Sequence, residues 1–142
     1  MLTELLIGTG MILLTVLTHG VGIFLLGRWL RIEAREEAAE NIHPMSVRGI
    51  AVTLGLVLGL FVLHGIEIFS YAVVYRVVDA LPSFDQAIYF STITYSTTGY
   101  NSEGLARHWE MIAAIEGLNG FILLGWSTAF FVTVIARMRS GR

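Results

Sequence analysis

Three long apolar stretches, separated by polar segments, dominate the chain. They run from about residue 5 to 26, 50 to 74 and 111 to 135. A helix that crosses a bilayer needs roughly 20 apolar residues, and each stretch is long enough. A fourth apolar segment, from about 84 to 95, is too short to cross and suits a short helix that enters the membrane and returns. The pattern therefore predicts an all-α membrane protein with three transmembrane helices and one re-entrant helix.

Basic residues are distributed unevenly around these stretches. Seven of the nine lie on one side of the predicted bilayer: Arg28, Arg31, Arg35, Arg48, Arg137, Arg139 and Arg142. Only Arg76 and Arg107 lie on the other side. Loops rich in Lys and Arg stay in the cytoplasm. We therefore expect the C-terminus inside, and the N-terminus and the loop over 84–101 outside, which agrees with an odd number of spans.

The first apolar stretch has two features that separate it from a cleaved signal peptide. No basic residues precede it, and it is longer than the apolar core of such a peptide. Arg28 and Arg31 follow it, as they would in a stop-transfer signal. We interpret it as a retained membrane helix.

Composition narrows the possible functions. Charged residues make up 14% of the chain, whereas about 25% is usual in soluble domains. A net charge of −2 provides no basic footprint for nucleic acid. The chain has no Cys, and no pair among its four His has the spacing of a metal-binding helix motif. No nucleophile–base pair stands out either, so we expect neither an enzyme nor a cofactor.

The short fourth segment carries the signals of a helix start. Pro82 ends the preceding segment, Ser83 can cap, and Gln86 follows at the spacing of a capping box. Asp85 favours a helix N-terminus through the helix dipole. The sequence predicts a helix that begins here and ends near Tyr95.

This helix leads directly into Ser96-Thr97-Thr98-Gly99-Tyr100-Asn101. The segment from Asp85 to Asn101 resembles the pore helix and selectivity filter of potassium channels, aligned without a gap. The positions that carry the resemblance are Ala87, Tyr89, Phe90, Ser91, Thr94, Thr97, Gly99 and Tyr100. It extends over the second and third spans and leaves the first span outside.

The resemblance implies a division of the chain. Residues 1–27 would form an extra N-terminal transmembrane helix, 28–47 a cytoplasmic connector and 48–142 a pore domain. Within the pore domain we expect an outer helix at about 48–76, a pore helix at about 84–95, a filter at 97–101 and an inner helix at about 109–137.

The resemblance also implies how ions would bind. An extended strand would place backbone carbonyls in rings that replace the water shell of K⁺. The residues of this filter would be Thr97, Thr98, Gly99, Tyr100 and Asn101. The Thr97 hydroxyl would add the innermost layer, and Gly99 would allow conformations that a Cβ penalises. One chain supplies one side of each ring, and the family assembles as a homotetramer in the lipid bilayer.

Four positions depart from the family pattern. The final glycine of the filter is Asn101, which tolerates a left-handed conformation, and the usual valine is Thr98. Ile93 replaces the glutamate of the pore helix, and Ser102 replaces the aspartate after the filter. The carboxylate pair that braces many such filters is therefore absent, and a less braced filter would also admit Na⁺.

Several residues are candidates for filter support and gating. Tyr89, Phe90 and Thr94 are supports by resemblance. Glu116 is our hypothesis for a replacement brace, because a carboxylate within the membrane is costly and usually functional; the alternative is an interfacial glutamate near the headgroups. Gly120 would be a gating hinge by resemblance, or else a site of close helix packing.

Two histidines lie within the apolar spans. His64 and Glu67 share one helix face and would form either a pH-sensitive pair or a simple hydrogen-bonded pair. His19 stands alone in its span, and a hydrogen bond in the core explains it best. No helix has the repeated Arg of a voltage sensor, and we expect no cytosolic ligand-binding domain after the third span. Gating would then arise in the membrane or from a regulatory partner.

These features predict a passive, potassium-selective channel subunit in the plasma membrane of a bacterial or archaeal cell. The alternatives are a weakly selective Na⁺/K⁺ channel and a non-conducting membrane adaptor. A subunit of a Trk- or Ktr-type transporter is disfavoured, because those proteins usually fuse four pore repeats in one chain and this chain has one.

Overall fold

The computed structural model describes residues 1–40, 46–99 and 105–140. Its helices are α1 (Leu2–Glu40), α2 (Val47–Val77), α3 (Phe84–Tyr95), the short 3₁₀ helix η1 (Arg107–Trp109) and α4 (Glu110–Ser140). These three ranges contain no strand, as expected for an all-α protein.

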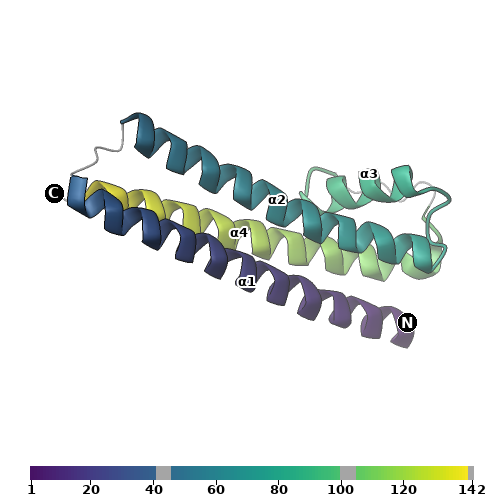
Figure 1. The fold of residues 1–142 in the computed structure, drawn as a ribbon. Helices are drawn as coiled ribbons and strands as arrows, with labels where there is room; N and C mark the ends of the chain where they lie inside the picture. The colour runs from purple at the N-terminus through teal and green to yellow at the C-terminus, as the bar shows by residue number, and fades with distance from the viewer. Residues whose placement is uncertain (41–45, 100–104, 141–142) are drawn as a thin grey trace.

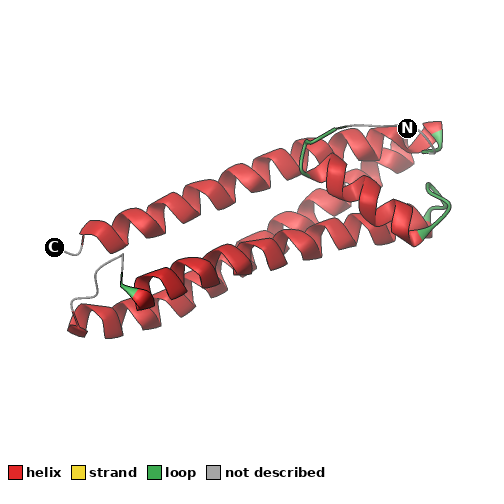
Figure 2. Ribbon diagram, turned by 90° about the horizontal axis from the view of Figure 1, so that it is seen from above, coloured by secondary structure: helices red, strands yellow, loops and turns green. Residues whose placement is uncertain are grey.

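The three long helices run side by side, and α3 packs against α2 and α4 at one end of the bundle (Figures 1 and 2). The N-terminus lies at the same end as α3, and the C-terminus lies at the opposite end (Figure 1). Three segments are long and apolar enough to cross a membrane: Leu2–Trp29, Val47–Val77 and Arg107–Ala136. The relative placement of the termini and α3 is the one that the arginine distribution predicts.

α1 continues well beyond the end of its apolar stretch. It has 39 residues, which at 1.5 Å per residue makes it about 58 Å long, whereas a bilayer core is about 30 Å thick. Its last part, over residues 33–40, consists of Glu, Ala and Arg, which are strong helix formers. Much of the expected 28–47 connector is therefore helix, and this part extends past the apolar span.

α2 begins close to the predicted position. The Ser46 side chain caps the helix by accepting a hydrogen bond from the Gly49 amide at 3.1 Å. α1 and α2 then pack closely, because a Cβ at Gly22 would overlap the Leu63 side chain and a Cβ at Gly59 would overlap Leu26. Small residues at helix crossings are typical of membrane proteins. The hydrophobic effect does not drive helices together within lipid, so they associate through van der Waals contacts, which small residues allow at close range.

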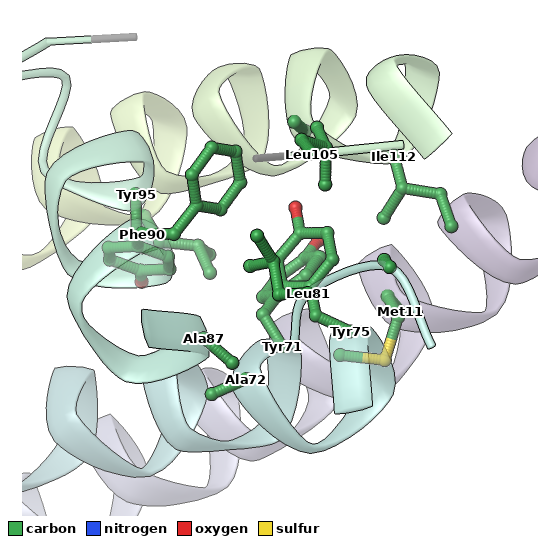
Figure 3. Packing of buried hydrophobic residues seen from close by; sticks show 13 residues of the cluster. Met11, Tyr71, Ala72, Tyr75, Leu81, Ala87, Phe90, Tyr95, Leu105 and Ile112 are labelled. Carbon is green, nitrogen blue, oxygen red and sulfur yellow. The ribbon is translucent and has the colours of Figure 1, made fainter. Parts of the chain in front are cut away.

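The buried core is concentrated at the α3 end of the bundle (Figure 3). Tyr71 and Tyr75 of α2 pack with Phe90 of α3 and Ile112 of α4. The rings of Tyr75 and Phe90 meet edge to face, with their centroids 5.3 Å apart. Met11 of α1 packs against the same cluster. Most of the remaining large apolar side chains face outward, as a lipid-contacting surface requires.

Candidate pore segment and its polar supports

α3 begins and ends where the sequence predicts. The Ser83 hydroxyl oxygen accepts a hydrogen bond from the Gln86 amide at 3.2 Å, and Asp85 lies in the first turn. Both groups stabilise a helix N-terminus. The predicted cap at Ser83 is therefore confirmed, and the helix ends at Tyr95.

A compact turn follows α3. The Thr97 amide donates to the Thr94 carbonyl and the Thr98 amide to the Ile93 carbonyl, both at 3.1 Å. This pair of bonds is the Schellman pattern, which needs a left-handed residue after the helix and usually takes Gly there. Thr97 occupies that position with φ 57°. A β-branched residue in this conformation is strained, and such strain gathers at functional sites.

The described part of the filter segment differs from the extended strand that we expected. Thr97 and Thr98 belong to the turn, and with Gly99 they are exposed on the single chain. The turn satisfies carbonyl groups that the end of α3 would otherwise leave unpaired. Tyr100 and Asn101, the other two predicted filter residues, lie outside the described residues.

Glu116 lies directly behind α3. Its side chain is fully buried, and one carboxylate oxygen accepts a hydrogen bond from the Tyr75 hydroxyl at 2.6 Å. The other oxygen meets the Ser91 hydroxyl of α3, which also lies 2.9 Å from the Ile68 carbonyl oxygen. Glu116 thus links α4, α3 and α2 from a position between the helices.

The three supports proposed by resemblance have different surroundings. Phe90 is buried against Tyr75. Thr94 is also buried, and its hydroxyl has no hydrogen-bond partner among the described residues. Tyr89 is 68% exposed, so its ring faces away from the core of this chain.

Gly120 marks the closest approach of α4 to the end of α3. A methyl group at this position would overlap the backbone carbonyl of Tyr95. This contact is close helix packing, which is one of the two roles considered for Gly120. The hinge role stays a prediction.

A second buried polar cluster consists of His19, His64, Glu67, Tyr95 and Ser127. The two carboxylate oxygens of Glu67 face different partners: Nδ1 of His19 lies 2.8 Å from one, and Nδ1 of His64 lies 3.1 Å from the other. The Tyr95 hydroxyl donates to the Glu67 oxygen that His64 also faces. Ser127 joins the two imidazoles, 2.9 Å from Nε2 of His64 and 3.3 Å from Nε2 of His19.

This cluster confirms the core hydrogen bond expected for His19 and identifies its partner as Glu67. The hydrogen-bonded pair of His64 and Glu67 is also present. The sequence offers no signal for the contact between His19 and Glu67, since 48 residues separate the two on different helices. Donor atoms of His19, His64 and Glu67 lie within 4.8 Å of one another, a spacing that could hold a metal ion. In this structure both Nδ1 atoms instead face the carboxylate.

An open hollow of about 620 Å³ lies between the pore segment and the first turns of α4. Thr94, Thr97 and Gly99 line one side, and Met111, Ala114, Gly117 and Leu118 are among the residues lining the other. The filter segment therefore borders open space rather than the packed core.

Three helices of membrane length, with a short capped helix that follows the second and packs against the second and third, indicate a multi-pass membrane protein. The family model described as "Ion channel" matches residues 50–137, more than half of the chain. The chain belongs to this ion channel family, and the match supports the potassium-channel-type resemblance. α1 lies outside the matched range. No curated protein and no solved structure matches the chain.

Proposed function

We propose that four copies of this chain form a potassium-selective channel, with residues 97–101 as its filter. One observation carries most of the proposal: α3 ends at Tyr95 and leads, through a turn with a left-handed Thr97, to Gly99, between the two long helices of an ion channel domain. A β-branched residue is unfavourable at such a position, and strain of this kind gathers at functional sites, which supports a role for the Thr97 hydroxyl. In this proposal that hydroxyl binds the innermost ion.

The position of α3 supports a pore helix. Its last residue, Tyr95, contacts His64 near the middle of α2 and packs against Gly120 of α4. α3 therefore runs from one end of the bundle toward the middle of the span. The negative end of its dipole would then face the middle of the membrane, where it favours a cation.

The conduction mechanism is passive. K⁺ exchanges its water shell for carbonyl rings at several sites, and neighbouring ions repel one another toward release. A single chain supplies only one side of each carbonyl ring, and the hollow beside Thr97 and Gly99 is open, so a closed ring needs further copies. Four copies close such a ring in the channels that the segment resembles.

A weakly selective Na⁺/K⁺ channel is the second candidate. Thr98 supports it, because its hydroxyl lies 2.8 Å from Ser96 Oγ, where the family's valine has no polar group. Glu116 supports the selective candidate, because it bonds the middle of α3 to both neighbouring helices. We place the channel in a bacterial or archaeal plasma membrane with the N-terminus outside, on the basis of the arginine distribution.

Cation flux into liposomes that contain the purified protein tests the proposal, first with K⁺ and then with Na⁺. We expect flux with K⁺ and little with Na⁺. Gly99→Ala should abolish flux without unfolding the subunit, because the part of the chain that the structure describes places nothing within 4 Å of the added methyl group. Gly65→Ala is a matched control, since its methyl group also meets nothing within 4 Å.

The possible outcomes separate the candidates. Equal flux with both ions would favour the weakly selective channel. Absence of flux from a monomer or dimer would favour the non-conducting adaptor. Absence of flux from a confirmed tetramer would point to a closed gate or a missing regulatory partner.

A further inference from the structure

α1 lies outside the family match, yet buried hydrogen bonds join it to the pore segment. His19 of α1 and Glu67 of α2 have no exposed surface in the chain, and 2.8 Å separates Nδ1 from the carboxylate oxygen. A carboxylate only accepts, so the imidazole N–H donates. The other oxygen of Glu67 accepts from Tyr95. One carboxylate therefore connects α1 directly to the last residue of α3.

Tyr95 is held at both of its ends. Its hydroxyl contacts Glu67 and lies 3.0 Å from Nδ1 of His64, while its backbone carbonyl packs against Gly120. The strained Thr97 follows only two residues later. A displacement of the Tyr95 ring would therefore be transmitted through a short, tightly bonded segment to the first residue of the proposed filter.

We propose that α1 is a positioning helix for the ion pathway, and that His19 is the residue through which it acts. His19 fixes one oxygen of Glu67, which leaves the other oxygen for Tyr95 and His64. This inference rests on the proposed function of residues 97–101 as a filter.

The hydrogen bonds show why His19 matters to the orientation of Glu67. In the described part of the chain, His19 is the hydrogen-bond partner of Oε1, while Tyr95 and His64 share Oε2. Without His19, a buried carboxylate oxygen would lack its partner, which is unfavourable inside a protein. The carboxylate could then turn toward other donors, and the bond to Tyr95 would lose its fixed geometry.

A second polar contact joins α1 to the bundle and does not involve Glu67. Thr15, one turn before His19, accepts a hydrogen bond from Asn119 of α4 at 2.7 Å, and Asn119 also bonds the Tyr71 hydroxyl at 3.1 Å. Loss of this contact would loosen α1 without touching Tyr95. It therefore separates a general role of α1 in packing from the specific role of His19.

The test compares His19→Asn with His19→Gln in the full-length protein. The Asn amide reaches about as far as Nδ1 of histidine and can still donate to Glu67. The Gln amide reaches about as far as Nε2, toward Ser127. Both substitutions keep a polar group, so both chains should fold. Thr15→Val is the matched control on the same helix face.

Two readouts apply: the ratio of K⁺ to Na⁺ flux in liposomes, and the difference in melting temperature between K⁺ and Na⁺ solutions. We expect His19→Gln to lower the ratio of K⁺ to Na⁺ flux at least fivefold. It should also reduce the difference in melting temperature between K⁺ and Na⁺ solutions. His19→Asn should stay within about twofold of the wild type. Thr15→Val should lower the melting temperature in both solutions and leave the ratio unchanged.

A wild-type ratio that favours K⁺ together with an unchanged ratio in His19→Gln would overturn this inference and leave the proposed function intact. The same would follow if Thr15→Val lowered the ratio as much as His19→Gln, because α1 would then act by packing alone. A wild type with equal flux of both ions, or one without flux that is a monomer or dimer, would overturn the proposed function and this inference with it. For a tetramer without flux, the difference in melting temperature between K⁺ and Na⁺ solutions decides, and an unchanged difference in His19→Gln would overturn this inference alone.

Discussion

Glu116 on α4 accepts a hydrogen bond from the Tyr75 hydroxyl on α2 at 2.6 Å, directly behind the helix that leads to the filter segment. The same carboxylate meets Ser91 of α3. Three helices are thus joined at one buried group. A buried carboxylate is unfavourable unless polar partners surround it, so the arrangement depends on all three residues.

Replacement of this group should weaken both the fold and the filter. Glu116→Leu removes the buried carboxylate that the Tyr75 and Ser91 hydroxyls contact, and we expect a loss of about 1–3 kcal/mol in the free energy of unfolding. Glu116→Gln keeps the shape and should lose less. Thermal unfolding in detergent measures the first effect, and the K⁺/Na⁺ flux ratio measures the second.

Glu110→Gln is the control for this experiment, because Glu110 lies on the same helix and is exposed. It should leave the free energy of unfolding unchanged, and it controls for stability alone because Glu110 also lines the hollow beside Thr97 and Gly99. Unaltered stability and selectivity in both Glu116 variants would show that Glu116 does not brace the filter.

The contact between Gly120 and Tyr95 allows a packing role of Gly120 to be tested against a hinge role. Gly120→Ala would place a methyl group against the Tyr95 carbonyl, and overpacking of this kind costs about 1–3 kcal/mol. We expect a lower melting temperature and a smaller yield of folded protein. Gly125→Ala is the control, since its methyl group meets nothing within 4 Å. A Gly120→Ala protein of normal stability that opens less often would instead favour the hinge.

The sequence predicted the helices well, because their signals are local. The apolar lengths predicted three spans, and Ser83 with its neighbours predicted the start of α3. The cluster around Glu67 was only half predicted. His64 lies one turn from Glu67, so helical spacing brings them together. His19 lies on another helix, and periodicity does not determine which faces of two helices meet.

The turn after α3 was not predicted from the sequence either. Resemblance favoured an extended strand from Thr97, and a threonine gives no local signal for a left-handed conformation. The observed turn arises from unpaired carbonyls at the helix end, which compete with any extended path. Local patterns therefore predicted the start and end of α3 better than the backbone of residues 97–99.

Thr97 should show a trade-off between stability and selectivity. Thr97→Gly removes the strain of a β-branched residue at φ 57°, and we expect a gain of about 1 kcal/mol in the free energy of unfolding. The same change removes the hydroxyl proposed to bind the innermost ion, so K⁺ flux should fall. Thr97→Ser keeps the hydroxyl and should retain most of the flux. A Thr97→Gly channel with normal flux and selectivity would remove the role proposed for this hydroxyl.

The orientation of the chain can be tested with single cysteines, because the sequence has none of its own. Thr3→Cys lies at the bundle end that carries α3, and Arg142→Cys lies next to the arginine-rich C-terminal segment. Since loops rich in arginine stay in the cytoplasm, a membrane-impermeant maleimide should label Thr3→Cys in intact cells. It should label Arg142→Cys only after lysis. The reverse pattern would place α3 and the filter segment on the cytoplasmic side, and the direction proposed for the pore would then be inverted.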